Sequence, residues 1–255
     1  MNKIQMFFKR IGMAEDTEVK CTFEFLKQVQ YNAVTTIAYE NLDILDGKPL
    51  SLSAEDLFEK IVINGRGGYC FEVNGLLSWF FKELGFEVTD YFARFLRDEK
   101  EVPMRRHRVL SVKCPDGLYF CDIGIGQIAP RLPLKMELGL VQEQFGEQYK
   151  FEMDKDLGWV LYDLHKGSWR PFISFTEEKK FEIDFLQPSF YCEKHPDSPF
   201  NKSPIIAIKT EKGRKTINNR EYKVFECENI VHIEENVSDE RFYELLKKEF
   251  NINYR

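Results

Sequence analysis

The hydrophobic period of the chain changes near residue 85, and this change limits which folds the sequence allows. Before it, apolar residues recur every three to four positions, as they do on the buried side of a helix. After it, short segments rich in Val, Tyr and Phe alternate as strands do. A second boundary is expected near residue 200. The 255 residues therefore predict helices first and sheets afterwards, in one domain or in two to three small modules packed as a unit.

The helical part contains three recognisable helices. Residues 18–31 place Cys21, Phe25 and Val29 on one stripe at spacings of four. Ser53 is a candidate N-cap for a second helix, which Asn64-Gly65 ends. The third and most apolar helix runs over about residues 71–84 and stops at Gly85. It follows directly on Gly67-Gly68-Tyr69-Cys70.

Ten strands are expected after residue 85, followed by one helix. Cys114-Pro115-Asp116-Gly117 is a turn signal and predicts a hairpin between two of the strands. Asn218-Asn219 is expected to form another turn, and Ser238 to cap the last helix. The expected strands are residues 87–95, 108–113, 118–122, 148–153, 159–164, 168–175, 205–210, 215–218, 222–226 and 230–234.

Composition excludes several function classes. The net charge of −6 leaves no overall basic surface, so nucleic acid is not expected as a partner. The first 13 residues lack the apolar core of a signal peptide, and no apolar run is long enough for a bilayer, so no membrane association is expected. The six cysteines show no CxxC pair and no regular framework. Without a signal peptide or a membrane span the protein is expected in the cytoplasm, and in that reducing compartment the cysteines are expected to be free thiols.

Cys70 is the cysteine with a local reason to be reactive. Gly67 and Gly68 allow a sharp turn before it, and a helix is expected to begin at it. The positive end of a helix lowers the pKa of a thiol, and the thiolate is the nucleophilic form. Free N–H groups of the first helical turn can hold an oxyanion. The alternative is a buried structural cysteine beside a helix start.

A nucleophilic thiol needs a base and a group that orients the base. His107 begins one strand of the predicted hairpin, and Asp122 ends the other strand. Pairing across the turn brings the two side chains close together, as in a triad of nucleophile, base and acid. Taken singly, His107 also fits a solvated strand-edge histidine and Asp122 a turn residue. His165, His195 and His232 have no carboxylate placed in this way and are expected at the surface or in packing.

Four separated segments carry a family resemblance. In chain order they are Tyr39-Glu40-Asn41-Leu42-Asp43-Ile44, Arg66-Gly67-Gly68-Tyr69-Cys70-Phe71-Glu72-Val73-Asn74, His107-Arg108-Val109-Leu110 and Asp122-Ile123-Gly124-Ile125-Gly126. Their sequences resemble the motifs of the arylamine N-acetyltransferases. Their order agrees with that family, as do the gaps of 37 residues from Cys70 to His107 and 15 from His107 to Asp122. The resemblance covers roughly residues 1 to 200.

The resemblance implies an α+β fold related to papain-like thiol enzymes. Residues 1–85 would form an N-terminal helical bundle that carries the nucleophile. Residues 86–198 would form a central β-barrel-like domain that carries the histidine and the aspartate. Residues 199–255 would form a C-terminal α/β lid.

The resemblance also implies the chemistry. Cys70, His107 and Asp122 would be the catalytic triad, with no metal. Acetyl-CoA would be the donor and an arylamine or arylhydrazine the acceptor. The reaction would be ping-pong, through an acetyl group carried on the Cys70 sulfur.

Further residues receive roles from the same segments. Gly124 and Gly126 would let a loop approach the CoA donor, although a plain strand-to-loop turn explains them equally. Ile125 stands where the family usually has Phe near the acceptor, so the substrate pocket is expected to differ. Glu40 and Arg66 are expected to form a buried ion pair that shapes the Cys70 turn, the alternative being two solvated charges.

Three other stretches bear on the donor site or depart from the family pattern. Tyr39 and Val73 replace the usual Phe and the usual Gln or Leu. Residues 191–200 match the Ser-Thr-Ser-Pro segment near the family's cofactor only loosely. The basic run Arg105, Arg106 and Arg108 would either meet CoA phosphates or form a solvated face.

Two other functional classes stay open at this point. A papain-like or transglutaminase-like thiol hydrolase or amide-forming enzyme uses Cys, His and an acid in the same order, but the papain spacing from Cys to His is much longer than 37 residues. A non-catalytic binding protein of the same fold would keep Cys70 unreactive.

Overall fold

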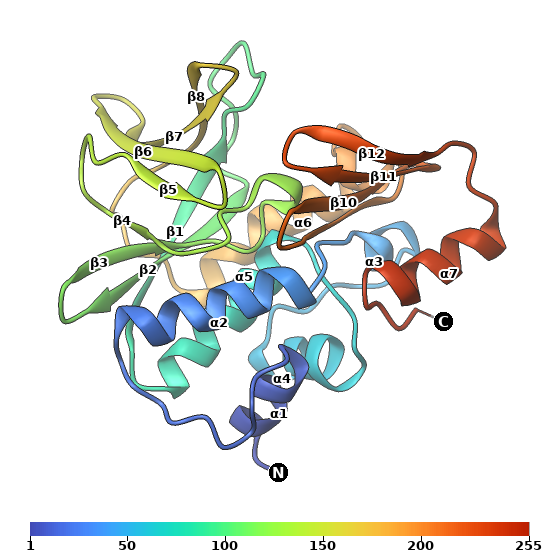
Figure 1. Ribbon diagram of the computed structural model, residues 1–255, viewed down its shortest axis with the longest axis horizontal. Coiled ribbons are helices and arrows are strands. Elements are labelled where there is room, and N and C mark those ends of the chain that lie inside the picture. The colour runs from blue at the N-terminus through green and yellow to red at the C-terminus, as the bar shows by residue number, and fades with distance from the viewer. Residues whose placement is uncertain (255) are drawn as a thin grey trace.

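The computed structural model describes residues 1–254, in which helices precede sheets along the chain (Figure 1). The N-terminal part is helical, as its hydrophobic period predicts. Its elements are α1 (Lys3–Arg10), α2 (Phe23–Thr36), α3 (Leu42–Leu45), α4 (Ala54–Phe58), the π-helix η1 (Glu59–Ile63) and α5 (Cys70–Glu83). Ser53 caps α4 by accepting a hydrogen bond from the backbone N–H of Asp56, as predicted. Gly85, with φ +89°, follows the end of α5.

One helix start differs from the prediction. Residues 18–21 are not helical, and α2 begins at Phe23 after the N-cap Thr22. The hydroxyl of Thr22 accepts a hydrogen bond from the N–H of Phe25 and fixes that start. Cys21 therefore lies outside the helix and is exposed, whereas Phe25 and Val29 are buried as predicted.

An eight-stranded antiparallel sheet follows and curls on itself (Figure 1). Its spatial order is β4-β3-β2-β1-β8-β7-β6-β5, so β4 and β5 are the two edges. The longer strands match those expected from alternation, whereas β4 and β5 are too short to show it. The strands are β1 (Glu87–Phe95), β2 (His107–Cys114), β3 (Gly117–Cys121), β4 (Leu134–Lys135), β5 (Gln142–Gln144), β6 (Glu147–Asp154), β7 (Gly158–His165) and β8 (Ser168–Phe175), with the 3₁₀ turn η2 (Gly126–Ile128) between β3 and β4.

Glutamine side chains join the two edges of this sheet. The amide of Gln142 accepts from the N–H of Lys135 and donates to its carbonyl, at 2.7 and 3.0 Å. Gln144 makes the same pair of hydrogen bonds with the backbone of Leu132. These side chains satisfy backbone groups that an open edge would leave unpaired. The sheet is therefore a nearly closed, barrel-like structure.

The C-terminal part is a second sheet with a helix against it (Figure 1). Phe242, Leu245 and Leu246 of the last helix pack on Ile206 and Ile217 of the sheet. The capping Ser238 and the turn at Asn219, with φ +56°, agree with the prediction. The elements are η3 (Glu182–Phe185), α6 (Leu186–Lys194), η4 (Pro199–Asn201), β9 (Ile205–Lys209), β10 (Gly213–Asn218), β11 (Glu221–Glu226), β12 (Asn229–Glu234) and α7 (Asp239–Glu249). Alternation did not reveal α6.

The helices and the barrel-like sheet share one core. Helix α5 lies against β1 and β2, and its Leu77 and Phe80 join Leu110 and Val112 of β2 in a single buried cluster. This packing sets the start of α5 beside the start of β2. The domain boundaries after residues 85 and 198 stay a prediction. No helix within residues 1–254 has the length and apolar character needed to cross a membrane.

A buried charge cluster joins the two sheets. The Lys209 Nζ of β9 contacts the Glu147 Oε1 of β6 at 2.7 Å. The Arg131 guanidinium contacts Glu147 Oε2 and donates to the carbonyls of Thr210 and Gly213. Burial lowers the pKa of the Lys209 ammonium to about 8, although Glu147 acts against the shift.

This cluster predicts a measurable pH dependence of stability. Because the native pKa of Lys209 lies below its unfolded value, the unfolded chain binds more protons between the two pKa values, and stability rises with pH in that window. Relative to Lys209→Met, the wild-type free energy of unfolding should rise by about 2 kcal/mol from about pH 7 to about pH 9.5, at about 1.4 kcal/mol per pKa unit. Urea unfolding of both proteins at several pH values measures this difference. A difference that stays constant with pH would contradict the assignment.

Candidate active site

Cys70 is the first residue of α5 and is buried, with 3% of its surface exposed. Tyr69 is the N-cap, and its backbone N–H donates to Glu72 Oε2 at 3.1 Å. Glu72 therefore caps the helix from within its own first turn. The sequence prediction that a helix begins at Cys70 is confirmed.

The turn before Cys70 is held between two other segments. The residue Tyr39 forms bridges to Gly68 on one side and to Ala207 of β9 on the other. A Cβ atom on Gly67 would collide with the carbonyl oxygen of Ala38, so the close approach of these backbones needs glycine at position 67. The nucleophile turn is thereby joined directly to the C-terminal sheet.

His107 and Asp122 meet as the hairpin predicts. Strands β2 and β3 pair from Cys114↔Gly117 to Leu110↔Cys121, which leaves Asp122 just beyond the last pair. The His107 Nε2 lies 2.7 Å from Asp122 Oδ2, and both side chains are buried. With Nε2 bonded to the carboxylate, Nδ1 of the ring remains for another partner.

Asn74 is a site residue that sequence reasoning did not assign. Its side-chain N–H₂ donates to Asp122 Oδ1 at 2.8 Å and to the carbonyl of Arg108 at 2.6 Å. Its Oδ1 accepts from the N–H of Ile123, and the N–H of Gly124 donates to Asp122 Oδ1 at 2.7 Å. The signal was present, because Asn74 lies four residues after Cys70 and so on the same helical face.

The Cys70 sulfur lies against the backbone on both sides of His107. Its Sγ is 3.9 Å from the carbonyl oxygen of Arg106. Burial raises the pKa of the Cys70 thiol well above its ordinary value, the Cys192 thiol and the Asp122 carboxylate add to this, and the backbone N–H groups of Phe71 and Arg108 oppose it. Burial thus opposes the lowering of the thiol pKa that the start of α5 is expected to give.

A cleft of about 790 Å³ opens at Cys70 and His107. Gly124, Ile125 and Gly126 line it, so the structure brings the predicted loop to the same cavity as the nucleophile. A Cβ atom on Gly124 would lie 2.7 Å from the Cα of Cys70, and Gly126 has φ +63°. Both glycines thus have a structural reason, independent of any ligand.

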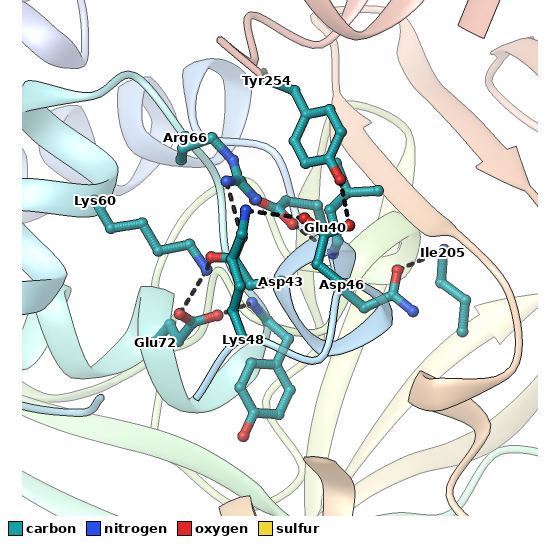
Figure 2. Close-up of polar contacts among 12 residues, drawn as sticks. Glu40, Asp43, Asp46, Lys48, Lys60, Arg66, Glu72, Ile205 and Tyr254 are labelled. Atoms are coloured by element: carbon teal, nitrogen blue, oxygen red, sulfur yellow. Dashed lines mark hydrogen bonds and ion pairs between the residues drawn. The ribbon is translucent and has the colours of Figure 1, made fainter. Parts of the chain in front are cut away.

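The predicted buried ion pair of Glu40 and Arg66 is confirmed and belongs to a larger network (Figure 2). Arg66 donates to Glu40 Oε1 at 2.8 and 3.1 Å and to Asp43 Oδ1 at 2.9 Å. Lys60, on the π-helix η1, lies 2.7 Å from both Asp43 Oδ2 and Glu72 Oε1. Burial acts to raise the pKa of Asp43, but Lys60 and Arg66 outweigh it and lower the pKa to about 2. The network thus reaches Glu72, which caps the helix that carries Cys70.

The basic run Arg105, Arg106 and Arg108 does not form a single charged surface. Arg108 is fully buried and contacts Asp90 Oδ1 and both carboxylate oxygens of Glu182, so for this residue both alternatives, a phosphate contact and a solvated face, are wrong. Arg105 lies at the surface, 3.7 Å from Glu178. Only Arg106 lines the cleft.

The other three histidines also lie in different environments. His195 and His232 are exposed, as predicted, and His232 lies 2.9 Å from Glu234. His165 is partly exposed and lines the cleft, with Nδ1 3.8 Å from Glu228.

Two further observations concern the segment 191–200 and possible metal ligands. The loosely matching segment 191–200 forms α6 and η4, and its Pro199 and Phe200 line the cleft. Within residues 1–254, no three His, Cys, Asp or Glu side chains converge closely enough to hold a metal ion.

Known proteins resemble this chain in sequence and in fold. A family described as N-acetyltransferase matches residues 22–255. An arylamine N-acetyltransferase of Mycolicibacterium smegmatis is 38% identical over 204 residues, which are 78% of this chain and 74% of that protein. The solved structure of the Salmonella typhimurium arylamine N-acetyltransferase superposes with a TM-score of 0.94 at 25% identity and covers 100% of this chain and 93% of the other. The Mycobacterium marinum arylamine N-acetyltransferase in complex with CoA gives 0.90 at 28%, with 98% and 93% covered.

The buried ion network predicts an asymmetric effect of mutation. Arg66→Gln leaves the fully buried Glu40 carboxylate without its guanidinium and should lower the free energy of unfolding by about 3–5 kcal/mol. The double variant Glu40→Gln/Arg66→Gln removes both charges and should recover part of that loss. Lys48→Gln is the matched control, because Lys48 is half exposed and should cost less than about 1 kcal/mol. Urea unfolding measures all three, and a double variant no more stable than Arg66→Gln would contradict the prediction.

Proposed function

The chain belongs to the arylamine N-acetyltransferase family, and from this premise we propose that it moves an acetyl group from acetyl-CoA to an aromatic amine or hydrazine through the Cys70 sulfur. The observation that carries this proposal is the buried His107–Asp122 pair at the cleft, with the Cys70 sulfur 3.9 Å from the carbonyl oxygen of Arg106, the residue before His107. A thiol nucleophile suits a thioester donor, because exchange between two thioesters is close to thermoneutral.

The first half-reaction charges the enzyme. His107 takes the proton of the Cys70 thiol at Nδ1, while Asp122 accepts the hydrogen bond of Nε2–H and stabilises the imidazolium. The thiolate attacks the acetyl carbonyl, and the N–H of Phe71 at the start of α5 supports the oxyanion. The carbon–sulfur bond to CoA breaks, the CoA thiol leaves with the proton from His107, and the acetyl group stays on Cys70.

The second half-reaction discharges it. The acceptor amine attacks the acetyl carbon and gives its proton to Nδ1 of His107. The bond between the acetyl carbon and the sulfur breaks, and the N-acetyl product leaves. The Cys70 sulfur then recovers the proton from His107, which restores the resting thiol. The two substrates use the cleft in turn, which is the ping-pong order.

Burial of the Cys70 thiol explains why it needs the His107–Asp122 pair. The desolvated thiol has a raised pKa, so it stays neutral until a neighbouring base accepts its proton. Asn74 and the N–H of Gly124 hold Asp122 in the orientation that lets it support the imidazolium. We therefore assign Asn74 a positioning role for the triad.

Several finer assignments are part of the same proposal. Gly124 and Gly126 would approach the CoA donor, and Ile125 would contact the acceptor, since all three line the cleft and a relative was solved with CoA. Ile125 packs against two buried clusters and offers an aliphatic wall to the acceptor. The relation to papain-like thiol enzymes, the division into bundle, barrel-like domain and lid, and a cytoplasmic location are proposed on the family resemblance.

The direct test is intact-mass measurement after incubation with acetyl-CoA. The wild type should gain one acetyl group, which an arylamine then removes, whereas Cys70→Ala should gain none because it lacks the attacking sulfur. Cys192→Ala removes another buried thiol near the site and is the matched control, which should still be acetylated.

The outcomes separate the functional classes. Acetylation of Cys70 followed by transfer to an arylamine supports the proposal. Cleavage of peptide amides without acetylation by acetyl-CoA would support a thiol hydrolase, and no reaction with either would support a binding protein. Acetyl transfer by Cys70→Ala at the wild-type rate would refute the role of the sulfur.

A further inference from the structure

The wall of the cleft formed by β7, β8 and the end of β1 carries two arginines. Arg97 follows β1, and Arg170 lies on β8, where its register partner on β7 is Asp163. All three residues line the cleft that opens at Cys70 and His107. We call Arg97, Asp163 and Arg170 the arginine wall.

Arg97 is held in place within this wall. Its Nη2 donates to Asp163 Oδ1 at 2.7 Å, and its guanidinium lies 5.6 Å from the centre of the Phe172 ring. The Arg97 side chain is 12% exposed, and its Nε is buried without a hydrogen-bond partner in residues 1–254. Arg97 is therefore a fixed cation with unused donor capacity.

Arg170 has no protein partner in the described chain. No hydrogen bond or ion pair joins its guanidinium to any of residues 1–254, and its Nε is buried and unpartnered. A guanidinium offers five N–H donors, and a buried donor left without an acceptor costs free energy. The Arg170 guanidinium beside the cleft is therefore available to donate hydrogen bonds to a ligand.

The surrounding charges leave the wall positive. Asp163 is one carboxylate beside two guanidinium groups. On the facing sheet the cations are already paired, Arg214 with Glu228 at 3.3 Å and Lys223 with Glu221. His165 of the same hairpin also faces Glu228, with Nδ1 3.8 Å from its carboxylate.

Two acidic side chains oppose this charge. Asp98 and Glu99 line the cleft next to Arg97, on the loop that follows β1. Both are exposed to solvent, where their field is screened, and neither contacts Arg97 or Arg170. They do not supply the missing partner of Arg170.

We propose that Arg97 and Arg170 form an anion subsite of the reaction cleft, which binds an anionic group of a substrate. The shared chemistry is an oxyanion that accepts paired N–H donors from a planar guanidinium. It is either a phosphate of the CoA donor or a carboxylate on the acceptor arylamine. The inference rests on the proposed acetyl transfer, because it assigns a specificity role within that reaction.

Arg170→Gln tests the subsite with two pairs of probes, each with one anionic and one uncharged member. On the donor side, the dissociation constants of CoA and of pantetheine, which lacks the nucleotide phosphates, are compared by calorimetry. On the acceptor side, kcat/KM is compared for 4-aminobenzoate and for uncharged 4-methylaniline. The anionic probe of one pair should lose about 10- to 100-fold relative to its uncharged partner, the range for a lost hydrogen bond to a charged group.

Three controls keep the test decisive. Lys166→Gln removes one positive charge from the exposed turn of the same hairpin, outside the cleft, and should change neither ratio. Arg170→Lys keeps the positive charge but loses the planar pair of N–H donors, and should restore only part of the lost ratio. If Arg170→Gln does not fold, raising the salt concentration on the wild type should weaken the anionic probe of the affected pair selectively.

The outcomes of this experiment can be told apart from those of the acetyl-transfer test. A selective loss for CoA assigns the subsite to the donor, and a selective loss for 4-aminobenzoate assigns it to the acceptor. Equal changes within both pairs would overturn the subsite. Calorimetric binding needs no turnover, so failure of acetyl transfer in the wild type would refute the function without deciding the subsite arm.

Discussion

The buried carboxylate of Asp122 is the constraint on which the site depends. It accepts hydrogen bonds from His107 on β2, from Asn74 on α5 and from the backbone N–H of Gly124 on the following loop. A fully buried carboxylate is tolerated only when several donors satisfy it, and here each donor comes from a different part of the fold. The site is therefore complete only when the helices are docked on the barrel-like sheet.

The second constraint is the ion network that reaches the first turn of α5. The ion network of Glu40, Arg66 and Lys60 ends at Glu72, which caps α5 at Tyr69 (Figure 2). Together with the bridges of Tyr39, it fixes where the first turn of α5 begins. The turn thus holds a desolvated thiol beside the backbone of Arg106, next to the His107 imidazole that we propose takes its proton.

The sequence predicted the parts of this arrangement that depend on local patterns. The cap at Ser53, the hairpin that joins His107 to Asp122, and the ion pair of Glu40 with Arg66 follow from turn residues, alternation and motif resemblance. Contacts between residues far apart in the sequence could not be predicted: the buried Arg108 pairs with Glu182, 74 residues away. The pKa of Cys70 likewise depends on burial by elements distant in sequence, which outweighs the local effect of the helix. Helix α6 was not predicted, because its apolar stripe is short and irregular.

The rate of Cys70 alkylation by iodoacetamide as a function of pH, read by peptide mapping, tests the central claim most directly. Mapping is needed because Cys21 and Cys227 are exposed and also react. If an oriented imidazole takes the proton, Cys70 should react at neutral pH faster than glutathione, and His107→Gln should slow it by about 100-fold or more. Equal rates at Cys70 in the wild type and in a folded His107→Gln variant would contradict the account.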